Sequence, residues 1–587
     1  MFFNNKYNIE ITTSNLYNMI LVTIKKSQVA CKTIDIDIII PNPALGKIVL
    51  QLPSWRPGRY EMQNFAKNIT YFTTLAAEGL GIDNRKVTKD SWEIEAVGHP
   101  EIKVSYGYYA NQMDAGGSYM TEEMLYINFI NCIFYVVGRI EDAYQIHIEL
   151  DDAFQIACGL PTLAPHVLSA SSFYELVDSP MVASRRLQSA SYVVENANFT
   201  IWIEGEHGLA MPSLLADFKK FTQTQFNIFK SFPFEQYHFL LLFLPYQHYH
   251  GVEHHNSTVI VLGPDYKIAQ PALYKELLGI SCHELFHAWN ALQIKPKELS
   301  PYDFTKENYF DTGFVLEGFT TYYGDYLLAR AGIWSVDQYM HELNAILKRE
   351  FDNFGSQTAS LSRSSVELWL DGYVQGIPNR KVSIYTKGCL FALLLDLSLR
   401  ASTNNTITLD KVMLELWERF GKTKRGYVAS DVVHLVNEIS GQDFKAFFDL
   451  SIFDAAPLQS LLHQKLAWVG CQLLCTESVF VSENYFGFRV SEKEGKCIVD
   501  YCEPGSEAAL YLAKNDEIIA VNGKKITHNL QDLLAKQSTI HLTLFRDSAL
   551  KTIVLTHHEN RYFKQYNIAP LETMSIDMKN NFQLWLS

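Results

Sequence analysis

The chain has 587 residues, of which 48% are hydrophobic and 19% charged, and its formal net charge is -14. This length exceeds what one hydrophobic core normally serves, and the apolar content excludes intrinsic disorder, so we expect several folded domains. The negative charge, without a dense stripe of Lys and Arg, argues against nucleic acid as a partner.

Cysteine usage and hydropathy indicate the compartment. Nine cysteines are scattered along the chain without a CxxC pair, which is typical of free thiols in a reducing environment. The first residues lack a basic segment followed by a long apolar core. The most apolar run, Leu390–Leu399, is about half the length of a membrane span. We therefore expect a cytoplasmic protein without a signal peptide or a membrane partner.

Residues 1–167 predict an antiparallel, sandwich-like β-domain. Short runs rich in β-branched residues recur there, at Tyr7–Thr12, Ile34–Ile40, Lys47–Leu52 and Tyr144–Leu150. In the second run acidic residues alternate with isoleucine, which is the two-residue period of a half-exposed sheet.

Residues 168–465 predict a mainly helical α+β domain. One buried strand is expected at Tyr237–Leu244, which Pro245 follows. Helical spacing of apolar residues recurs in six segments: Leu214–Phe232, Pro271–Ile294, Thr312–Arg330, Ser335–Asp352, Lys387–Arg400 and Leu409–Phe420.

The strongest chemical signal is His283-Glu284-Leu-Phe-His287 within the predicted helix 271–294. Two histidines four positions apart project from nearly one helix face, so both rings can reach one metal ion. Glu284, beside the first histidine, can take a proton from a zinc-bound water. Helical histidines can instead be hydrogen-bonded core residues, but the apolar residues before the motif bury this helix.

A catalytic zinc needs a third protein ligand and an open position. Glu317 lies far enough beyond His287 for a loop and a returning helix, and its neighbours Phe314, Leu316, Phe319 and Tyr322 are apolar. A surface carboxylate is the alternative, but a buried, unpaired carboxylate is costly, which favours metal ligation. We expect one zinc ion, held by His283, His287 and Glu317.

These motifs together resemble the glycyl aminopeptidase family of zinc metallopeptidases. The resemblance rests on HELFHAWN, on Leu316-Glu317-Gly-Phe-Thr-Thr-Tyr-Tyr-Gly-Asp, on Leu52-Pro-Ser-Trp-Arg-Pro-Gly-Arg-Tyr60 and on Tyr385-Thr-Lys-Gly388. It implies an N-terminal β-domain, a thermolysin-like catalytic domain and a C-terminal PDZ domain. It also implies release of N-terminal Gly or Ala from peptides.

The resemblance assigns substrate-binding roles to Gly251 and Glu253, since related aminopeptidases place such a carboxylate at the free amine of the substrate. His250 departs from the glycine that the family often has before Gly251. The four histidines at 248, 250, 254 and 255 form an alternative metal site, which alternation on a strand disfavours. By the same resemblance, Tyr385 hydrogen-bonds the oxyanion; the alternative is a tyrosine that stacks on the core.

Residues 466–557 return to short strands and match a PDZ domain in the order of their turns. The matching segments are Asn484–Phe488, Glu503–Ser506, Asp516–Val521 and Asn522-Gly523. Such a domain captures C-terminal peptides by strand addition, or else only packs on the catalytic domain. Residues 558–587 form an extension without a clear signal.

Three hypotheses follow from these residues. The first is an aminopeptidase, the second an endopeptidase with the same metal site, and the third an inert scaffold whose PDZ domain binds peptides. The complete set His283, Glu284, His287 and Glu317 argues against the third.

Overall fold

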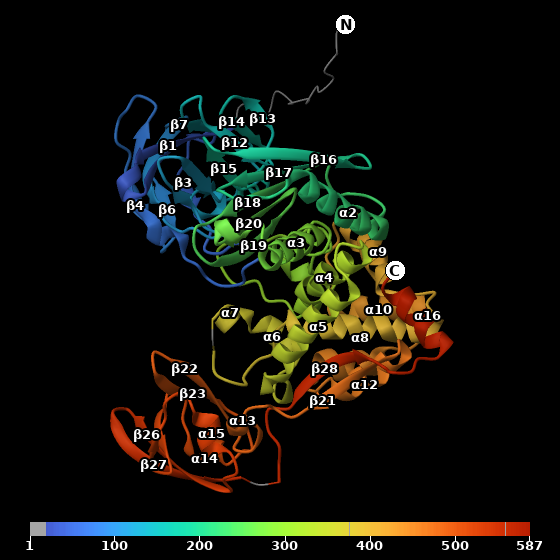
Figure 1. Cartoon of the computed structure of the whole chain (residues 1–587). Helices are drawn as coiled ribbons and strands as arrows, with labels where there is room; N and C mark the ends of the chain where they lie inside the picture. Colours follow the sequence, from blue (N-terminus) through green and yellow to red (C-terminus); the bar gives the residue numbers. More distant parts are fainter. Residues whose placement is uncertain (1–18, 375, 558) are drawn as a thin grey trace.

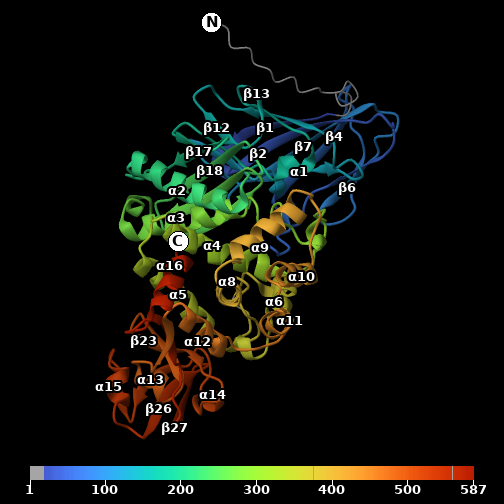
Figure 2. The ribbon, with the colours of Figure 1, turned by 90° about the vertical axis from the view of Figure 1, so that its right-hand side faces the viewer.

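The computed structural model describes residues 19–374, 376–557 and 559–587. Figures 1 and 2 show β-sheets of the N-terminal part at one end, helices in the middle and a further sheet at the opposite end. The predicted strand Tyr7–Thr12 lies outside the described residues. Within the described ranges, no helix has both the length and the apolar character to cross a membrane. All nine cysteines are free thiols.

A seven-stranded sheet dominates the N-terminal part. Its strands, in spatial order, are β13 (Thr162–Ala164), β14 (Val167–Ala170), β11 (Tyr144–Glu149), β1 (Ile20–Gln28), β2 (Thr33–Pro41), β7 (Glu101–Tyr109) and β4 (Ile69–Ala76). Burial alternates along β2, which confirms the predicted period. The expected antiparallel β-domain is confirmed, with one parallel pair in this sheet, between β1 and β11. The strands between them supply the long crossover that parallel pairing requires.

Two four-stranded sheets complete this part. One holds β10 (Tyr135–Val136), β3 (Ile48–Gln51), β6 (Ser91–Ile94) and β5 (Asn84–Lys86); the other holds β12 (Gln155–Cys158), β15 (Met181–Ser184), β9 (Met124–Ile127) and β8 (Tyr119–Met120). Since β15 pairs with β9, the second of these sheets extends past residue 167, where the sequence places the boundary.

A five-stranded sheet supports the central part. Its order is β16 (Gln188–Val194), β17 (Ala197–Glu204), β18 (Gln236–Phe243), β20 (Ser257–Gly263) and β19 (His248–His254), so β19 lies at an edge. The three middle strands are parallel and largely buried, as parallel strands covered on both faces are. β18 corresponds to the predicted strand Tyr237–Leu244.

Helices make up most of the rest of the central part. They include α2 (Met211–Phe229), α3 (Pro271–Phe286), α4 (Thr320–Arg330), α5 (Val336–Phe351), α8 (Thr386–Thr403), α9 (Leu409–Leu416), α10 (Ala429–Ser440) and α12 (Gln459–Trp468). Among them, α2 and α3 pack on this sheet. Two differ from expectation: α3 ends before Ile294, and a π-helical turn, Phe314–Phe319, precedes α4. The multidomain α+β fold, with an N-terminal β-domain and a mainly helical region, is confirmed.

The last sheet has its own hydrophobic core. It is formed by β22 (Phe488–Lys493), β23 (Lys496–Cys502), β24 (Glu517–Val521), β25 (Lys524–Lys525), β26 (Thr539–Arg546) and β27 (Ala549–Thr556), with short helices α13 (Val481–Asn484), α14 (Ala508–Tyr511) and α15 (Leu530–Leu534). β22 lies at one edge of this sheet.

The C-terminal extension returns to the central helices. Strand β28 (Gln565–Pro570) pairs with β21 (Cys471–Thr476), and α16 (Ile576–Trp585) follows. Trp585 is 0% exposed, and its Nε1 donates to the Tyr322 hydroxyl at 3.2 Å. The extension therefore ties the C-terminus to α4.

Candidate metal centre

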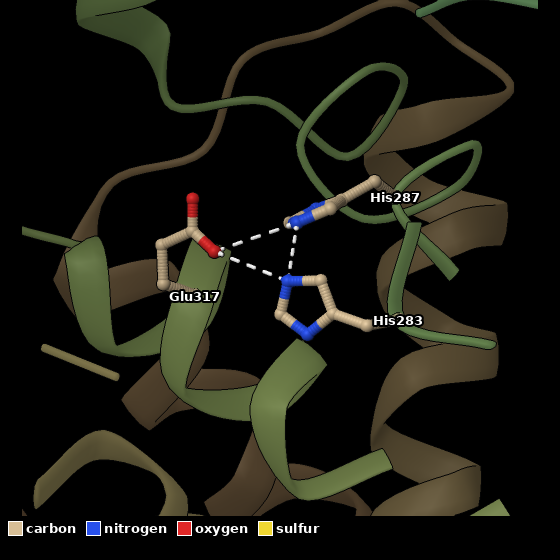
Figure 3. A group of neighbouring side chains, drawn as sticks. All are labelled: His283, His287 and Glu317. Carbon is tan, nitrogen blue, oxygen red and sulfur yellow. Dashed lines mark hydrogen bonds and ion pairs between the residues drawn. The ribbon is translucent and has the colours of Figure 1, made fainter. Parts of the chain in front are cut away.

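The two histidines of the HELFH motif converge on one point. His283 lies in the last turn of α3, and His287 occupies its C-terminal end in helical conformation. Their Nε2 atoms are 3.1 Å apart (Figure 3). The Nδ1 atom of His287 lies 2.9 Å from the backbone oxygen of Asn290, which can only accept. In the neutral ring, Nδ1 therefore carries the proton and Nε2 presents its lone pair.

Glu317 reaches the same point from the π-helical turn before α4. Its Oε2 lies 3.4 Å from His287 Nε2 and 3.8 Å from His283 Nε2 (Figure 3). Gly318 makes this approach possible, because a Cβ there would lie 2.6 Å from Gly388 Cα on α8. The close contact of the two helices holds the carboxylate in place.

Asn290 connects His287 with the turn that carries Glu317, a role that the sequence did not predict. It is 0% exposed, and its amide donates to the carbonyl oxygens of Val315 at 2.7 Å and Leu316 at 3.3 Å. These bonds take up carbonyl groups in the π-helical turn, and π-turns of this kind are frequent at functional sites. Asn290 thus orients both ligands: its side chain holds the turn of Glu317, and its carbonyl holds the ring of His287.

The donor set and its charge fit a divalent cation. The ligand atoms of His283, His287 and Glu317 lie within 4.8 Å of one another, and Glu317 Oε2 is buried without a hydrogen-bond donor among the described residues. Burial alone would lower the pKa of His287, but Glu317 and Glu253 raise it to about 10. A metal ion held by both Nε2 atoms would replace that stabilised proton. Two nitrogens and one carboxylate oxygen suit zinc.

Glu284 lies directly beside these groups. Burial raises its pKa far above the usual range, and the negative charge of Glu253 adds to this, against the opposing charge of His287. A Cβ at Gly251 would lie 2.3 Å from Glu284 Oε1, so only glycine lets the edge strand β19 pass this close to α3.

Glu253, also on β19, forms the other wall of the group. One of its oxygens, one Glu284 oxygen and one His287 nitrogen lie within 4.8 Å of one another. The N-terminal domain covers Glu253, because a Cβ at Gly58 would lie 2.7 Å from its Oε2. Gly58 has a φ of 77°, which glycine adopts without strain. The sequence did not predict that the segment 52–60 covers Glu253. Its Pro-Gly turn was the feature that could have indicated such a close approach.

Tyr385 lies at the N-terminal end of α8 and is partly exposed. Burial would raise the pKa of Glu317, but the nearby His287, His283 and Tyr385 side chains hold it below the usual value. A cavity of about 390 Å³ opens in front of the group, and it is lined in part by His250, Gly251, His283, Glu284, Trp334 and Tyr385.

The histidines around Glu253 have other partners. His254 Nδ1 lies 3.0 Å from Asp178 Oδ1, and His250 Nδ1 accepts from the Ala115 amide at 3.2 Å. Among the described residues, the groups suited to a metal are His283–His287–Glu317 and Glu253–Glu284–His287.

Comparison with known proteins found two matching domain models and several similar structures. Residues 21–185 match the peptidase M61 N-terminal domain, and residues 276–391 match M61 glycyl aminopeptidase. The crystal structure of an aminopeptidase N family protein from Idiomarina loihiensis has a TM-score of 0.87 at 26% identity, over 97% of this chain and 100% of that one. An M1 zinc metallopeptidase from Deinococcus radiodurans has a TM-score of 0.47 at 12% identity, over 74% and 93%. No curated protein matches.

The second matched region contains both histidines, Glu284, Glu317 and Tyr385, and the first contains Gly58. The neighbour that matches 97% of this chain carries an aminopeptidase name. The chain thus carries segments that match the peptidase M61 N-terminal domain and the M61 glycyl aminopeptidase domain, and it is a zinc-dependent peptidase.

Proposed function

We propose that the enzyme removes single residues from the free N-terminus of peptides, with one zinc ion held by His283, His287 and Glu317. The observation that carries the N-terminal specificity is the position of Glu253. Its carboxylate lies beside Glu284 and His287 on an edge strand, where Gly58 covers it. An α-ammonium needs a fixed counter-ion at a set distance from the scissile bond, and Glu253 supplies one.

Zinc, when bound, polarises the peptide carbonyl and makes a water molecule nucleophilic near neutral pH. The chain's own part begins with orientation: Asn290 positions His287 through its carbonyl and the Glu317 turn through its amide. Side chains held from a second layer in this way set the geometry and basicity of ligands.

Proton transfer falls to Glu284. Its carboxylate takes a proton from the attacking water and delivers it to the leaving amine. Tyr385, which lines the cavity, donates a hydrogen bond to the oxygen that gains negative charge.

The resemblance further proposes a preference for N-terminal Gly or Ala. An endopeptidase with the same metal site is the second candidate, and it would have no need of an amine-binding carboxylate. Comparison of free peptides with N-acetylated peptides separates the two. We expect cleavage of the free peptides only; equal cleavage of both would refute the aminopeptidase.

The function of Glu284 is tested with Glu284→Gln. This variant should retain zinc and lose turnover by about 10²-fold or more. The control is Glu298→Gln, since Glu298 is exposed. Turnover in Glu284→Gln at the wild-type rate would remove Glu284 from the mechanism.

We also propose that residues 466–557 act as a PDZ domain for C-terminal peptides. In support, β22 is an edge strand and Gly487 before it has a φ of 72°. An added peptide strand would pair with β22. The alternative is packing alone, for which Arg489 contacts Asp352 at 3.2 Å. Titration with C-terminal peptides and their amidated forms tests binding; equal affinity for both would reject carboxylate capture.

A further inference from the structure

A second cavity, of about 250 Å³, is lined by Glu253 but by none of the proposed zinc ligands. It lies between the N-terminal domain and the loop after α3. Most of its walls are apolar or aromatic, and they include Pro57, Ile130, Val177, Tyr174, Tyr302 and Phe304. At about 30 Å³ per water, this space holds roughly eight waters. It is far larger than the methyl group of an N-terminal alanine requires.

Five side chains that can carry charge border this cavity: Arg56, Asp178, Glu253, His254 and Lys295. Most of them have partners. Asp178 accepts the amide of His255 at 3.2 Å and lies 3.0 Å from His254 Nδ1. Arg56 donates to the Pro57 carbonyl at 3.0 Å, and Glu253 is assigned to the substrate amine.

Lys295 differs from Arg56 in that its charged group makes no hydrogen bond to any of the described residues. Its ammonium lies over the ring of Tyr302, 4.1 Å from the centroid, and within the described ranges no carboxylate oxygen lies within 4.0 Å of it. Burial lowers the pKa of Lys295 to about 8, and Asp178 opposes this only in part. The backbone is fixed, because the Lys295 carbonyl accepts the Tyr427 amide at 3.1 Å. A cation that is held in place, without an anionic partner, invites an anionic ligand.

We infer that this cavity receives the side chain of the substrate's N-terminal residue and that Lys295 binds the carboxylate of an N-terminal Glu or Asp. The inference rests on the proposed binding of the amine by Glu253. A residue whose amine is at Glu253 has its side chain attached two bonds from the amine nitrogen, and Glu253 itself lines the cavity. Gly and Ala leave the cavity to water and remain substrates, so acidic residues extend the proposed range.

The charge balance distinguishes carboxylate from amide. Once the substrate amine neutralises Glu253, and with Asp178 engaged by His254 and His255, Lys295 and Arg56 leave the cavity net positive. A glutamate side chain then gains a charge-assisted hydrogen bond that the isosteric glutamine lacks. A lysine side chain would meet like charge.

The test uses the full-length zinc enzyme and matched peptides that begin with Glu, Gln, Lys or Ala. For the wild type, kcat/KM should be at least about tenfold higher for Glu than for Gln. This ratio should fall close to one in Lys295→Met and persist in Lys295→Arg. The control Lys297→Met, at an exposed position on the same loop, should keep the wild-type ratio.

A ratio near one in the wild type, a preference for Lys, or a ratio that Lys295→Met does not change would each overturn the inference. A test without variants also exists: free glutamate should inhibit cleavage of the Ala peptide more strongly than free glutamine, and equal inhibition would count against Lys295. Failure of the aminopeptidase proposal looks different, because acetylated peptides would then be cleaved as well as free ones.

Discussion

Replacement of Asn290 by Ala tests how much the orientation of Glu317 contributes to metal binding, because it leaves all three proposed metal ligands in the chain. The side chain makes three bonds, to Val315 O at 2.7 Å, Leu316 O at 3.3 Å and Thr320 Oγ1 at 2.9 Å. Thr320 Oγ1 still donates to Leu316 O at 2.7 Å in the variant, so only the Val315 carbonyl loses this donor. One buried carbonyl without its donor costs about 1–3 kcal/mol, and the small cavity adds about 1 kcal/mol.

The unfolding free energy of the metal-free variant should therefore fall by about 2–4 kcal/mol, measured by urea denaturation. Because the Glu317 turn loses its anchor, zinc affinity should fall about 10- to 100-fold in a chelator competition titration. Asn42→Ala is the matched control. Asn42 is 3% exposed and donates to three carbonyls in the N-terminal part, so its loss should destabilise without weakening zinc. A folded Asn290→Ala variant with unchanged zinc affinity would refute this reasoning.

Three more predictions follow from single contacts. Gly58→Ala should raise KM for free peptides by about tenfold, since its Cβ would press on Glu253 Oε2; an unchanged KM in steady-state kinetics would contradict this. Burial lowers the pKa of His238 to about 4, and Trp202 Nε1 donates to its Nδ1, so stability present above pH 6.5 should be lost as the pH falls toward 4, by about 3 kcal/mol at most. His238→Asn should flatten that loss in denaturation curves at pH 4–7, and an equal slope would disprove the assignment. Trp585→Ala should lower the unfolding free energy by about 3–5 kcal/mol with zinc affinity retained, and a smaller change would mean that α16 adds little.

Local spacing was sufficient for much of the site. Two histidines four positions apart on a helix must share a face, so HELFH predicted the pair whose Nε2 atoms are 3.1 Å apart. The apolar neighbours of Glu317 predicted a buried carboxylate, and it is 3% exposed. Strand β2 was equally readable, because alternation is set by the strand itself.

Other features depend on which segments meet in space. The π-helical turn before α4 takes a hydrogen bond from Asn290, which no local pattern reveals. The cover over Glu253 comes from Gly58, nearly two hundred residues earlier in the chain. Strand β28 is held by its pairing with β21, and Trp585 is held by its hydrogen bond to Tyr322.

The sequence by itself therefore determined the chemistry: which side chains can bind zinc, which can move a proton, and which helix holds them. Only the tertiary structure decided what surrounds that chemistry, including the cover of Gly58 over Glu253 and the cavity that Glu253 and Lys295 line together. The physical reason is range. Ligand spacing is a property of one helix turn, whereas a cavity exists only after walls from distant segments have packed around it.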